Sequence, residues 1–136
     1  MWTSIFPFFA EPSGYDASAL LAPDLRAQWV GDWGLLGLFF VFQLFNTFLG
    51  EEFIFHGVLL PKMEGVFGKW DWLANGVIFS LYHLHQPWGI LANIPANLVF
   101  AFSGKRFHSN WFPIILHSGQ GIIFMSLILG LILGLA

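Results

Sequence analysis

An apolar run of 27 residues, 34–60, contains two adjacent carboxylates, Glu51 and Glu52, and this combination constrains the fold more than any other feature of the chain. A helix over this run is about 40 Å long at 1.5 Å per residue, enough to cross the ~30 Å hydrocarbon core of a bilayer. A charged side chain in that core costs at least ~2.5–3.5 kcal/mol, so acids at this depth normally face a polar, functional cavity. His56 supports this interpretation, because Glu52 and His56 are spaced i, i+4 and share one helix face.

One alternative places the acids outside the hydrocarbon. If a first helix ended at Gly50, the two glutamates would lie at the interface in the first turn of a new helix, where they would favour the macrodipole. The two interpretations differ in whether Gly50 lies inside a helix or at its end.

Composition indicates a membrane protein. Of the 136 residues, 57% are hydrophobic and 10% are charged, with a mean hydropathy of +0.70, whereas soluble domains carry about 25% charged residues. The sequence has no cysteine, which excludes disulfides, thiol nucleophiles and thiolate metal ligands. The net charge is −3 and the five Lys and Arg are scattered, so the chain has no nucleic-acid-binding footprint.

We therefore predict an all-α integral membrane bundle with about four transmembrane helices. Residues 1–33 are too interrupted to span and form an N-terminal interfacial segment, with Trp2, Trp29 and Trp33 near the headgroups. Residues 34–136 form the transmembrane core. The four predicted helices cover residues 34–60, 72–86, 90–103 and 111–135.

Individual residues predict where these helices begin and end. Pro61 disfavours helix at the residue before it and is expected to end the first span. Asp71 and Asn110 are placed to cap the second and fourth helices, and Pro113 suits the first turn of the fourth.

Proline and glycine leave two interpretations open inside the helices. Pro95 predicts that the short third stretch is kinked or re-entrant. Gly130 and Gly134 form a small-xxx-small pair for close helix packing, or are ordinary glycines of a membrane helix.

Basic residues predict the topology. Lys62 and Lys69 lie in the connection after the first helix, and Lys105 and Arg106 lie in the connection before the fourth. By the positive-inside rule these two connections are cytoplasmic, and both ends of this chain are on the outer side.

Ionisable groups on three helices are predicted to lie at comparable depth. Counted from the basic side at 1.5 Å per residue, Glu51, His83 and His117 lie about 15, 16 and 9 Å deep. Burial lifts the pKa of a carboxyl group toward the working range of a general base. Two glutamates and two histidines can therefore act as a base and its polarising partners.

Three short motifs on these helices resemble those of the CPBP (Abi) intramembrane proteases. EEFIFH at residues 51–56 resembles the motif EExxxR, FSLYH at residues 79–83 resembles FxxxH, and the helix of His117 resembles HxxxN. This family includes type II CAAX prenyl proteases and bacteriocin-processing or immunity proteins. The resemblance covers about residues 45–124 and implies an α-helical membrane endopeptidase that hydrolyses peptides with a glutamate-activated water and without a metal or other cofactor.

The resemblance also implies roles for four residues. Glu51 would be the general base and Glu52 its neighbour in the motif. His83 would help to hold the water, and His117 would stabilise the oxyanion, which needs a donor preset where charge develops.

This chain departs from the family pattern at three positions. His56 stands in place of the motif arginine, Gly121 in place of the asparagine four residues after His117, and Pro87 in place of the asparagine that some members have after His83. The family has further helices before the first motif, so we expect this chain to be a minimal core or a fragment.

Other amides can replace the missing donors. Gln120 is the supporting residue that we favour with His56, and Asn93 or Asn97 are further candidates. His85 is two residues from His83 and is expected to point to another face.

Other functions remain open. A serine nucleophile at Ser80 or Ser118 is an alternative, as is a non-catalytic membrane scaffold or immunity protein on the same fold. A further alternative is a zinc or iron site. Its ligands would be Glu52, His56, His83 and His117.

The expected setting is a prokaryotic plasma membrane, in which the chain crosses more than once. Its expected partners are membrane lipid and a membrane-associated peptide or protein substrate, with no nucleic acid. The sequence leaves the oligomeric state open.

Overall fold

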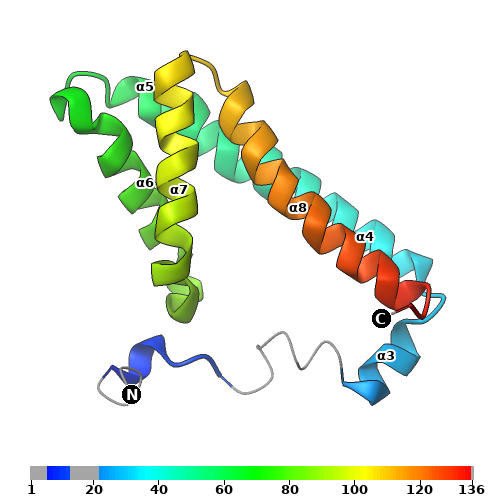
Figure 1. The fold of residues 1–136 in the computed structure, drawn as a ribbon. Helices are drawn as coiled ribbons and strands as arrows, with labels where there is room; N and C mark the ends of the chain where they lie inside the picture. The colour runs from blue at the N-terminus through cyan, green and yellow to red at the C-terminus, as the bar shows by residue number, and fades with distance from the viewer. Residues whose placement is uncertain (1–5, 13–21, 136) are drawn as a thin grey trace.

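A computed structural model describes residues 6–12 and 22–135, and the described residues form helices and turns with no strand. Two helix pairs meet at one end and diverge toward the other (Figure 1). The elements are η1 (Pro7–Phe9), α3 (Pro23–Trp29), α4 (Trp33–Gln43), η2 (Leu44–Leu59), α5 (Leu60–Lys62), η3 (Gly68–Trp70), α6 (Asp71–Tyr82), η4 (His83–His85), α7 (Pro87–Phe107) and α8 (Trp111–Ile132). The all-helical class predicted from the sequence is confirmed.

Elements α4, η2 and α5 form one helix of 30 residues, Trp33–Lys62. It begins where the Asp32 side chain accepts a hydrogen bond from the Leu35 amide at 2.9 Å. Gly50 lies within it, so the alternative of a break there is wrong. The helix also continues through Pro61, two residues beyond the predicted end at residue 60.

The middle of this helix, η2, is a π-helix, in which each amide bonds to the carbonyl five residues back rather than four. For example, the amide that caps its end, on Leu60, donates to the carbonyl of Phe55. Residues five apart therefore approach each other along η2, which contains both glutamates.

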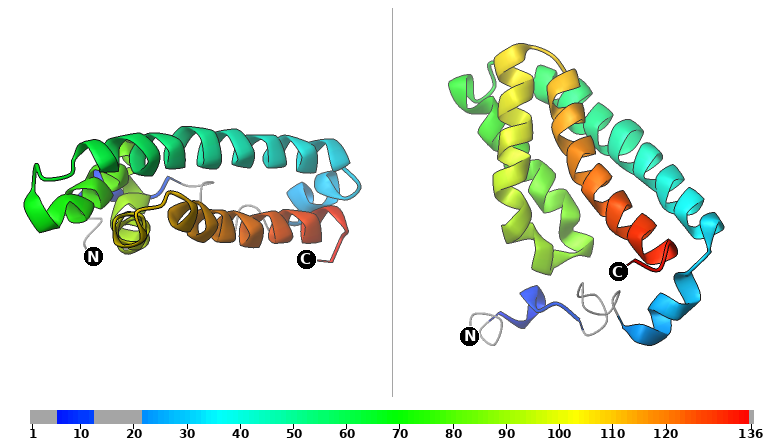
Figure 2. Two further views of the ribbon diagram at one scale, coloured as in Figure 1. Left: turned by 90° about the horizontal axis from the view of Figure 1, so that it is seen from above. Right: turned by 45° about the vertical axis from the view of Figure 1, so that its right-hand side comes forward.

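Helix α8 runs back beside α4 and η2 (Figure 2). Ile128, Leu131 and Ile132 are buried there against Trp29, Leu36 and Phe39. The predicted helix to residue 135 is three residues too long, since α8 ends at Ile132.

Gly134 explains why α8 ends at Ile132. Gly134 has φ +69°, and the amides of Gly134 and Leu135 donate to the carbonyls of Leu131 and Gly130 at 3.1 and 2.8 Å. This is a Schellman motif, in which a left-handed glycine satisfies the last carbonyls. The small-xxx-small interpretation of Gly130 and Gly134 is therefore wrong, because Gly134 follows the helix.

The second pair, α6 and α7, packs closely at Gly76. A Cβ there would lie 3.0 Å from the carbonyl oxygen of Asn97, so only glycine allows this approach. Asn97 also donates to the Ser80 hydroxyl at 3.0 Å, which ties the two helices together.

The predicted limits of these two helices need correction. Helix α7 has 21 residues and passes through Pro95, so the re-entrant alternative is wrong. Pro87 starts α7 in the first turn, where its missing N–H is unneeded, and α6 ends at Tyr82 rather than residue 86.

The two predicted caps form differently. Asp71 is the first residue of α6, and its carboxylate accepts from the amides of Gly65 and Phe67 in the preceding loop at 3.1 and 2.8 Å. Asn110 stands at the N-cap of α8, but its side chain instead donates to the backbone carbonyl of Glu52 at 3.3 Å. Pro113 lies in the first turn of α8, as predicted.

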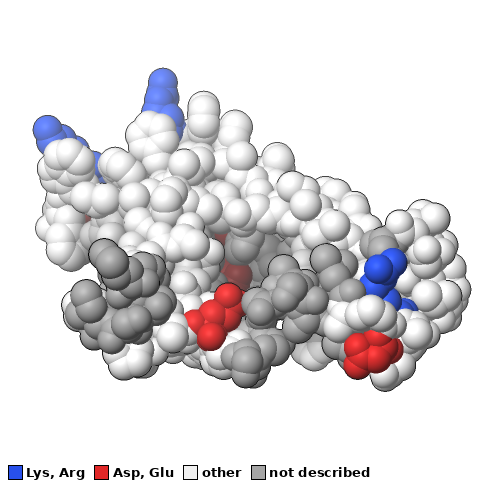
Figure 3. All heavy atoms as spheres, turned by 60° about the horizontal axis from the view of Figure 1, so that its bottom comes forward, with Lys and Arg blue, Asp and Glu red and all other residues white. Residues whose placement is uncertain are grey.

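Within residues 6–12 and 22–135, two helices are long and apolar enough to cross a membrane, Trp33–Lys62 and Trp111–Ile132. The predicted number of four spans is not confirmed, and α6, with 12 residues, is about 18 Å long. Large apolar side chains such as Ile122 (67%) and Leu127 (62%) are exposed along α8. Uncharged side chains also make up most of the described surface in Figure 3.

In the N-terminal segment, Trp29 packs against α8 and Trp33 is exposed, while Trp2 lies outside the described residues. The interfacial role of residues 1–33 and the division at residue 34 stay predictions.

Candidate functional site

Two glutamates and three histidines from η2, η4 and α8 converge where the helix pairs meet. Glu51 and Glu52 are buried, with 6% and 0% of their surface exposed, and so is His56. The side chains of His83 and His117 keep 18% and 16%. These five residues are the ones whose chemistry the sequence singled out, and the structure brings them together.

Glu52 is the centre of the cluster's hydrogen bonds. One carboxylate oxygen accepts from Nδ1 of His56 and the other from Nδ1 of His117, both at 2.8 Å. A carboxylate can only accept, so each imidazole carries its proton on Nδ1. Glu52 thereby fixes the orientation of both rings and directs Nε2 of each away from itself.

Glu51 is held more loosely and faces the two partly exposed histidines, His83 and His117. Its Oε1 accepts from the Asn46 amide at 3.1 Å, a contact between residues five apart that the π-helix makes short. Nε2 of His83 and Nε2 of His117 each lie 3.7 Å from a Glu51 oxygen. This exceeds a hydrogen bond and suits a bridging water among the three groups.

His83 is oriented by the backbone. Helix α6 ends one residue earlier, and Nδ1 of His83 donates to the carbonyl of Phe79 at 3.0 Å. Nε2, which faces Glu51, is then the acceptor in the neutral ring. His85 does not point to another face as expected, because the 3-10 turn stacks its ring on that of His83 with centroids 5.8 Å apart.

Phenylalanines surround the cluster. Phe79 has no exposed surface, and its ring lies 5.3 to 6.0 Å from the rings of His83, His56 and His117. Phe100 stacks on His117 at 5.0 Å and 21°. These rings separate the charged groups from solvent on the side of α6 and α7, where low polarity strengthens their electrostatic interactions.

The predicted supporting amides lie elsewhere. Gln120 is exposed on α8, Asn97 bonds to Ser80, and Asn93 is half-buried on α7. The amide that borders the cluster, Asn46, was missed by the sequence interpretation. Its signal was present, as a polar residue five positions before Glu51 in an otherwise apolar run.

Gln43 was missed as well. A Cβ on Gly121 would lie 2.7 Å from Cδ of Gln43, so the Gln43 carboxamide occupies the space that a side chain at position 121 would need. Gln43 donates to the buried hydroxyl of Thr47 at 2.9 Å. An amide therefore lies over α8 one turn after His117.

The serine and metal alternatives find limited support. The Ser80 hydroxyl donates to the Gly76 carbonyl at 2.8 Å and accepts a hydrogen bond from Asn97. Its proton is therefore used in a hydrogen bond to its own helix and is not directed to a histidine. In the part of the chain that the structure describes, no group of three His, Cys, Asp or Glu side chains has the arrangement of a metal site.

Buried paired carboxylates beside imidazoles on apolar helices bring together groups that can act as acids and bases within a helical bundle. The family model of type II CAAX prenyl endopeptidases, Rce1-like, matches residues 33–123. The chain belongs to this family of membrane proteases, which confirms the resemblance seen in the three motifs. No curated protein and no solved structure matches the chain.

Proposed function

We propose that the chain is an intramembrane endopeptidase that hydrolyses peptide bonds with a water activated by Glu51. The observation that carries this proposal is the position of the Glu51 carboxylate, with Nε2 of His83 and Nε2 of His117 each 3.7 Å away. A base and two polar partners that face one common position are what proton abstraction from water requires.

Each residue then has a task. Glu51 takes a proton from water and passes it to the leaving amine. The lone pair on Nε2 of His83 accepts a hydrogen bond from the other O–H of the water and orients the nucleophile. Nε2 of His117 faces the same position, from which an N–H on this atom would point to the developing oxyanion. Glu52 orients this ring, because its carboxylate accepts a hydrogen bond from Nδ1 at 2.8 Å.

An apolar groove supports a membrane-anchored substrate. A cavity of about 660 Å³ lies between α4 and α8, with Leu36, Phe40 and Met125 in its wall. It reaches Ser118, next to His117, so a lipid anchor or apolar segment in the groove would leave the adjoining peptide at Glu51. CAAX-type C-termini and leader peptides fit this description.

The proposed setting is a prokaryotic plasma membrane that the chain crosses more than once. Lys105 lies in the last turn of α7, not in a connection as predicted, and its ammonium donates to the Gly68 carbonyl at 3.2 Å. The basic end of α7 and the basic loop before α6 therefore lie at the same end of the bundle. By the positive-inside rule that end is cytoplasmic.

The test offers purified protein a panel of membrane-anchored peptides with CAAX-type C-termini or leader sequences. We expect the wild type to cleave at least one, and Glu51→Gln to lower the rate by about 10²–10⁴, the contribution of a positioned general base. The control is Glu11→Gln, an exposed acid outside the cluster. Cleavage by Glu51→Gln at the wild-type rate would exclude Glu51 as the base, and a wild type that binds the peptides without cleaving them would favour the scaffold alternative.

A further inference from the structure

The apolar groove between α4 and α8 has one side-chain amide in its wall. Gln43, Ser118 and Ser126 are the polar residues among the described ones that line this groove. Gln43 is half-buried, and one N–H of its Nε2 donates to the Thr47 hydroxyl at 2.9 Å. In the described part of the chain, the other N–H and the oxygen of this amide have no hydrogen-bond partner. A donor and an acceptor of Gln43 therefore remain available at the groove.

This amide lies at the inner end of the groove, close to the glutamate cluster. It covers Gly121 on α8, where it occupies the space that a side chain at position 121 would need. Gly121 follows His117 by four residues, or about 6 Å along the helix. An extended peptide covers that distance with about two residues at ~3.3 Å each. A peptide that reaches Glu51 from the groove thus passes the Gln43 amide about two residues away from the reacting bond.

The long first helix becomes polar at Gln43. Between residues 34 and 60 it has six polar side chains, and none precedes position 43. They are Gln43, Asn46, Thr47, Glu51, Glu52 and His56. The Asn46 amide donates to Oε1 of Glu51 at 3.1 Å. The polar stretch that contains both glutamates therefore begins beside the groove.

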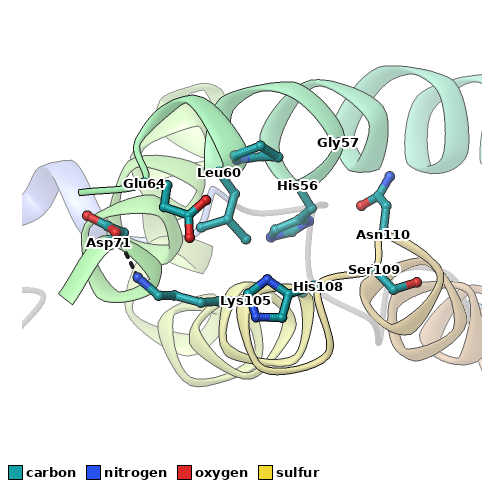
Figure 4. Close-up of a pocket in the computed structure, with 11 residues that line it drawn as sticks. His56, Gly57, Leu60, Glu64, Asp71, Lys105, His108, Ser109 and Asn110 are labelled. Carbon is teal, nitrogen blue, oxygen red and sulfur yellow. Dashed lines mark hydrogen bonds and ion pairs between the residues drawn. The ribbon is translucent and has the colours of Figure 1, made fainter. Parts of the chain in front are cut away.

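The other cavity beside the cluster does not suit an apolar anchor. It has a volume of about 260 Å³ and lies at the end that carries the basic residues (Figure 4). His56 of the cluster borders it, together with Glu64 and His108. In its wall the Lys105 ammonium pairs with the Asp71 carboxylate at 2.7 Å. An apolar group here would separate these charges from water, which is costly, so the apolar groove is the one that accepts the anchor.

A substrate peptide needs hydrogen-bond partners at this point of the groove. An extended segment has no internal hydrogen bonds, and each unpaired backbone group is costly where water is scarce. The Gln43 oxygen can accept from a backbone N–H, and its free N–H can donate to a backbone carbonyl. The N–H and C=O of one residue point to the same side of an extended chain, so one side-chain amide can pair with both.

We propose that the Gln43 amide is a substrate-binding group that holds the backbone of one substrate residue about two residues from the scissile bond. This inference rests on the proposed function, because it needs a peptide that extends from the groove to Glu51. The amide comes from α4, while Gly121 of α8 stands in place of the asparagine of the motif. Glycine at position 121 leaves the space that the Gln43 amide takes, so the two residues form one arrangement.

The first test measures binding without cleavage. The probe is a fluorescent, farnesylated peptide with a CAAX-type C-terminus, and its affinity for detergent-solubilised Glu51→Gln protein is measured by fluorescence anisotropy. In each analogue an ester replaces one backbone amide other than the scissile one, which removes an N–H and weakens a carbonyl acceptor. Gln43→Met, made in the same background, removes the amide but keeps a side chain of similar size over Gly121. Gln120→Met changes an exposed glutamine of α8 and is the control.

Gln43→Met should weaken binding of the all-amide peptide by about two- to tenfold, the effect of one hydrogen bond. One ester analogue should bind the Glu51→Gln protein more weakly by the same factor and lose nothing further in the Gln43→Met protein, since groups in contact are not additive. Gln120→Met should bind like its parent. Unchanged affinity in Gln43→Met would overturn the proposal, as would an equal loss for every ester in both proteins or a lack of binding.

The second test moves the amide to the other helix. In Gln43→Ala/Gly121→Asn the new Cβ takes the place that the Gln43 amide has left, so the asparagine amide lies near the same point. In the Glu51→Gln background this variant should regain most of the affinity. Gln43→Ala/Gly121→Leu fills a similar volume without an amide and should bind as weakly as Gln43→Met. Thermal unfolding checks that both are folded, and a folded asparagine variant that binds no better than the leucine variant would overturn the role of Gln43.

Cleavage separates this inference from the proposed function. If binding depends on Gln43 but the protein with Glu51 intact cleaves no peptide of the panel, the proposed function fails and the peptide-binding role of Gln43 stands. If the protein cleaves with a dependence on Glu51 while binding is independent of Gln43, the proposed function stands and this inference fails.

Discussion

The side chain of Gln43 lies directly over Gly121, with its Cδ 2.7 Å from where a Cβ on residue 121 would be. The pair joins the long first helix to α8 one turn after His117. A glycine at position 121 is therefore a packing requirement of Gln43, and not a neutral loss of the motif asparagine.

Gly121→Ala is expected to destabilise the protein relative to Gly119→Ala. Gln43 must leave its place and its bond to Thr47, and overpacking of this kind costs about 1–3 kcal/mol. Gly119 is the matched control on the same helix, since its Cβ would meet nothing within 4 Å. Thermal unfolding in detergent measures both, and Gln43→Ala should remove the difference. Equal unfolding temperatures for the two alanine variants would show that Gln43 moves freely.

Phe79→Ala should cost about 3–5 kcal/mol and most of the activity. The ring is fully buried and touches the rings of three site histidines, so its loss leaves a cavity among them. Phe53→Ala, which removes a ring that is 59% exposed, serves as the control. Denaturant unfolding and peptide cleavage are measured together. A Phe79→Ala protein that is as stable and active as Phe53→Ala would contradict the packing role.

The Asp71–Lys105 pair should stabilise the protein only above acid pH. The hydrogen bond from Lys105 is the main factor that holds the pKa of the Asp71 carboxyl below its ordinary value of 3.8. A lowered pKa in the folded state means that the stabilisation is complete above the unfolded value and is lost as pH falls through the folded one.

Asp71→Asn tests this pH dependence. The difference in unfolding temperature between wild type and variant should be constant from about pH 5 to 7 and shrink below about pH 4. Asp24→Asn, which changes an exposed acid, is the control. A difference that persists unchanged into acid would mean that Asp71 acts through its loop hydrogen bonds rather than its charge.

Single cysteines should label from opposite sides of the membrane. Val66 is 66% exposed in the loop with the basic residues, and Leu135 is 79% exposed at the far end of α8. The chain has no native cysteine, so each variant carries one thiol. In intact cells an impermeant reagent should label Leu135→Cys, and Val66→Cys only after lysis. The reverse pattern would place the basic loop on the outer side and contradict the positive-inside assignment.

Hydrophobic runs predicted the long helices well, because length and apolar content alone determine where a helix can lie in lipid. The start of α8 at Trp111 and the first helix to within two residues follow from that rule. The third helix was underestimated, since Pro95 faces outward and removes only one backbone bond.

The site was less predictable. Shared depth indicated that Glu51, His83 and His117 would meet, and the structure brings them together, while their catalytic roles stay predictions. Nothing in the sequence indicated that Phe79 would contact three histidines or that Gln43 would fill the space beside Gly121. Both depend on how helices rotate about their axes, which amino-acid spacing on one helix does not determine.

The π-helical form of η2 makes the placement of the acid pair a matter of helical phase. Each residue turns a helix by about 100° in the α-form and by less in the wider π-form. Removing one residue between Leu44 and Gly50 would therefore swing Glu51 and Glu52 away from α8 while leaving hydrophobicity almost unchanged. Membrane insertion would tolerate that deletion, but the carboxylates would then point at lipid. In this stretch of the chain the number of residues, more than their identity, preserves the position of the two carboxylates.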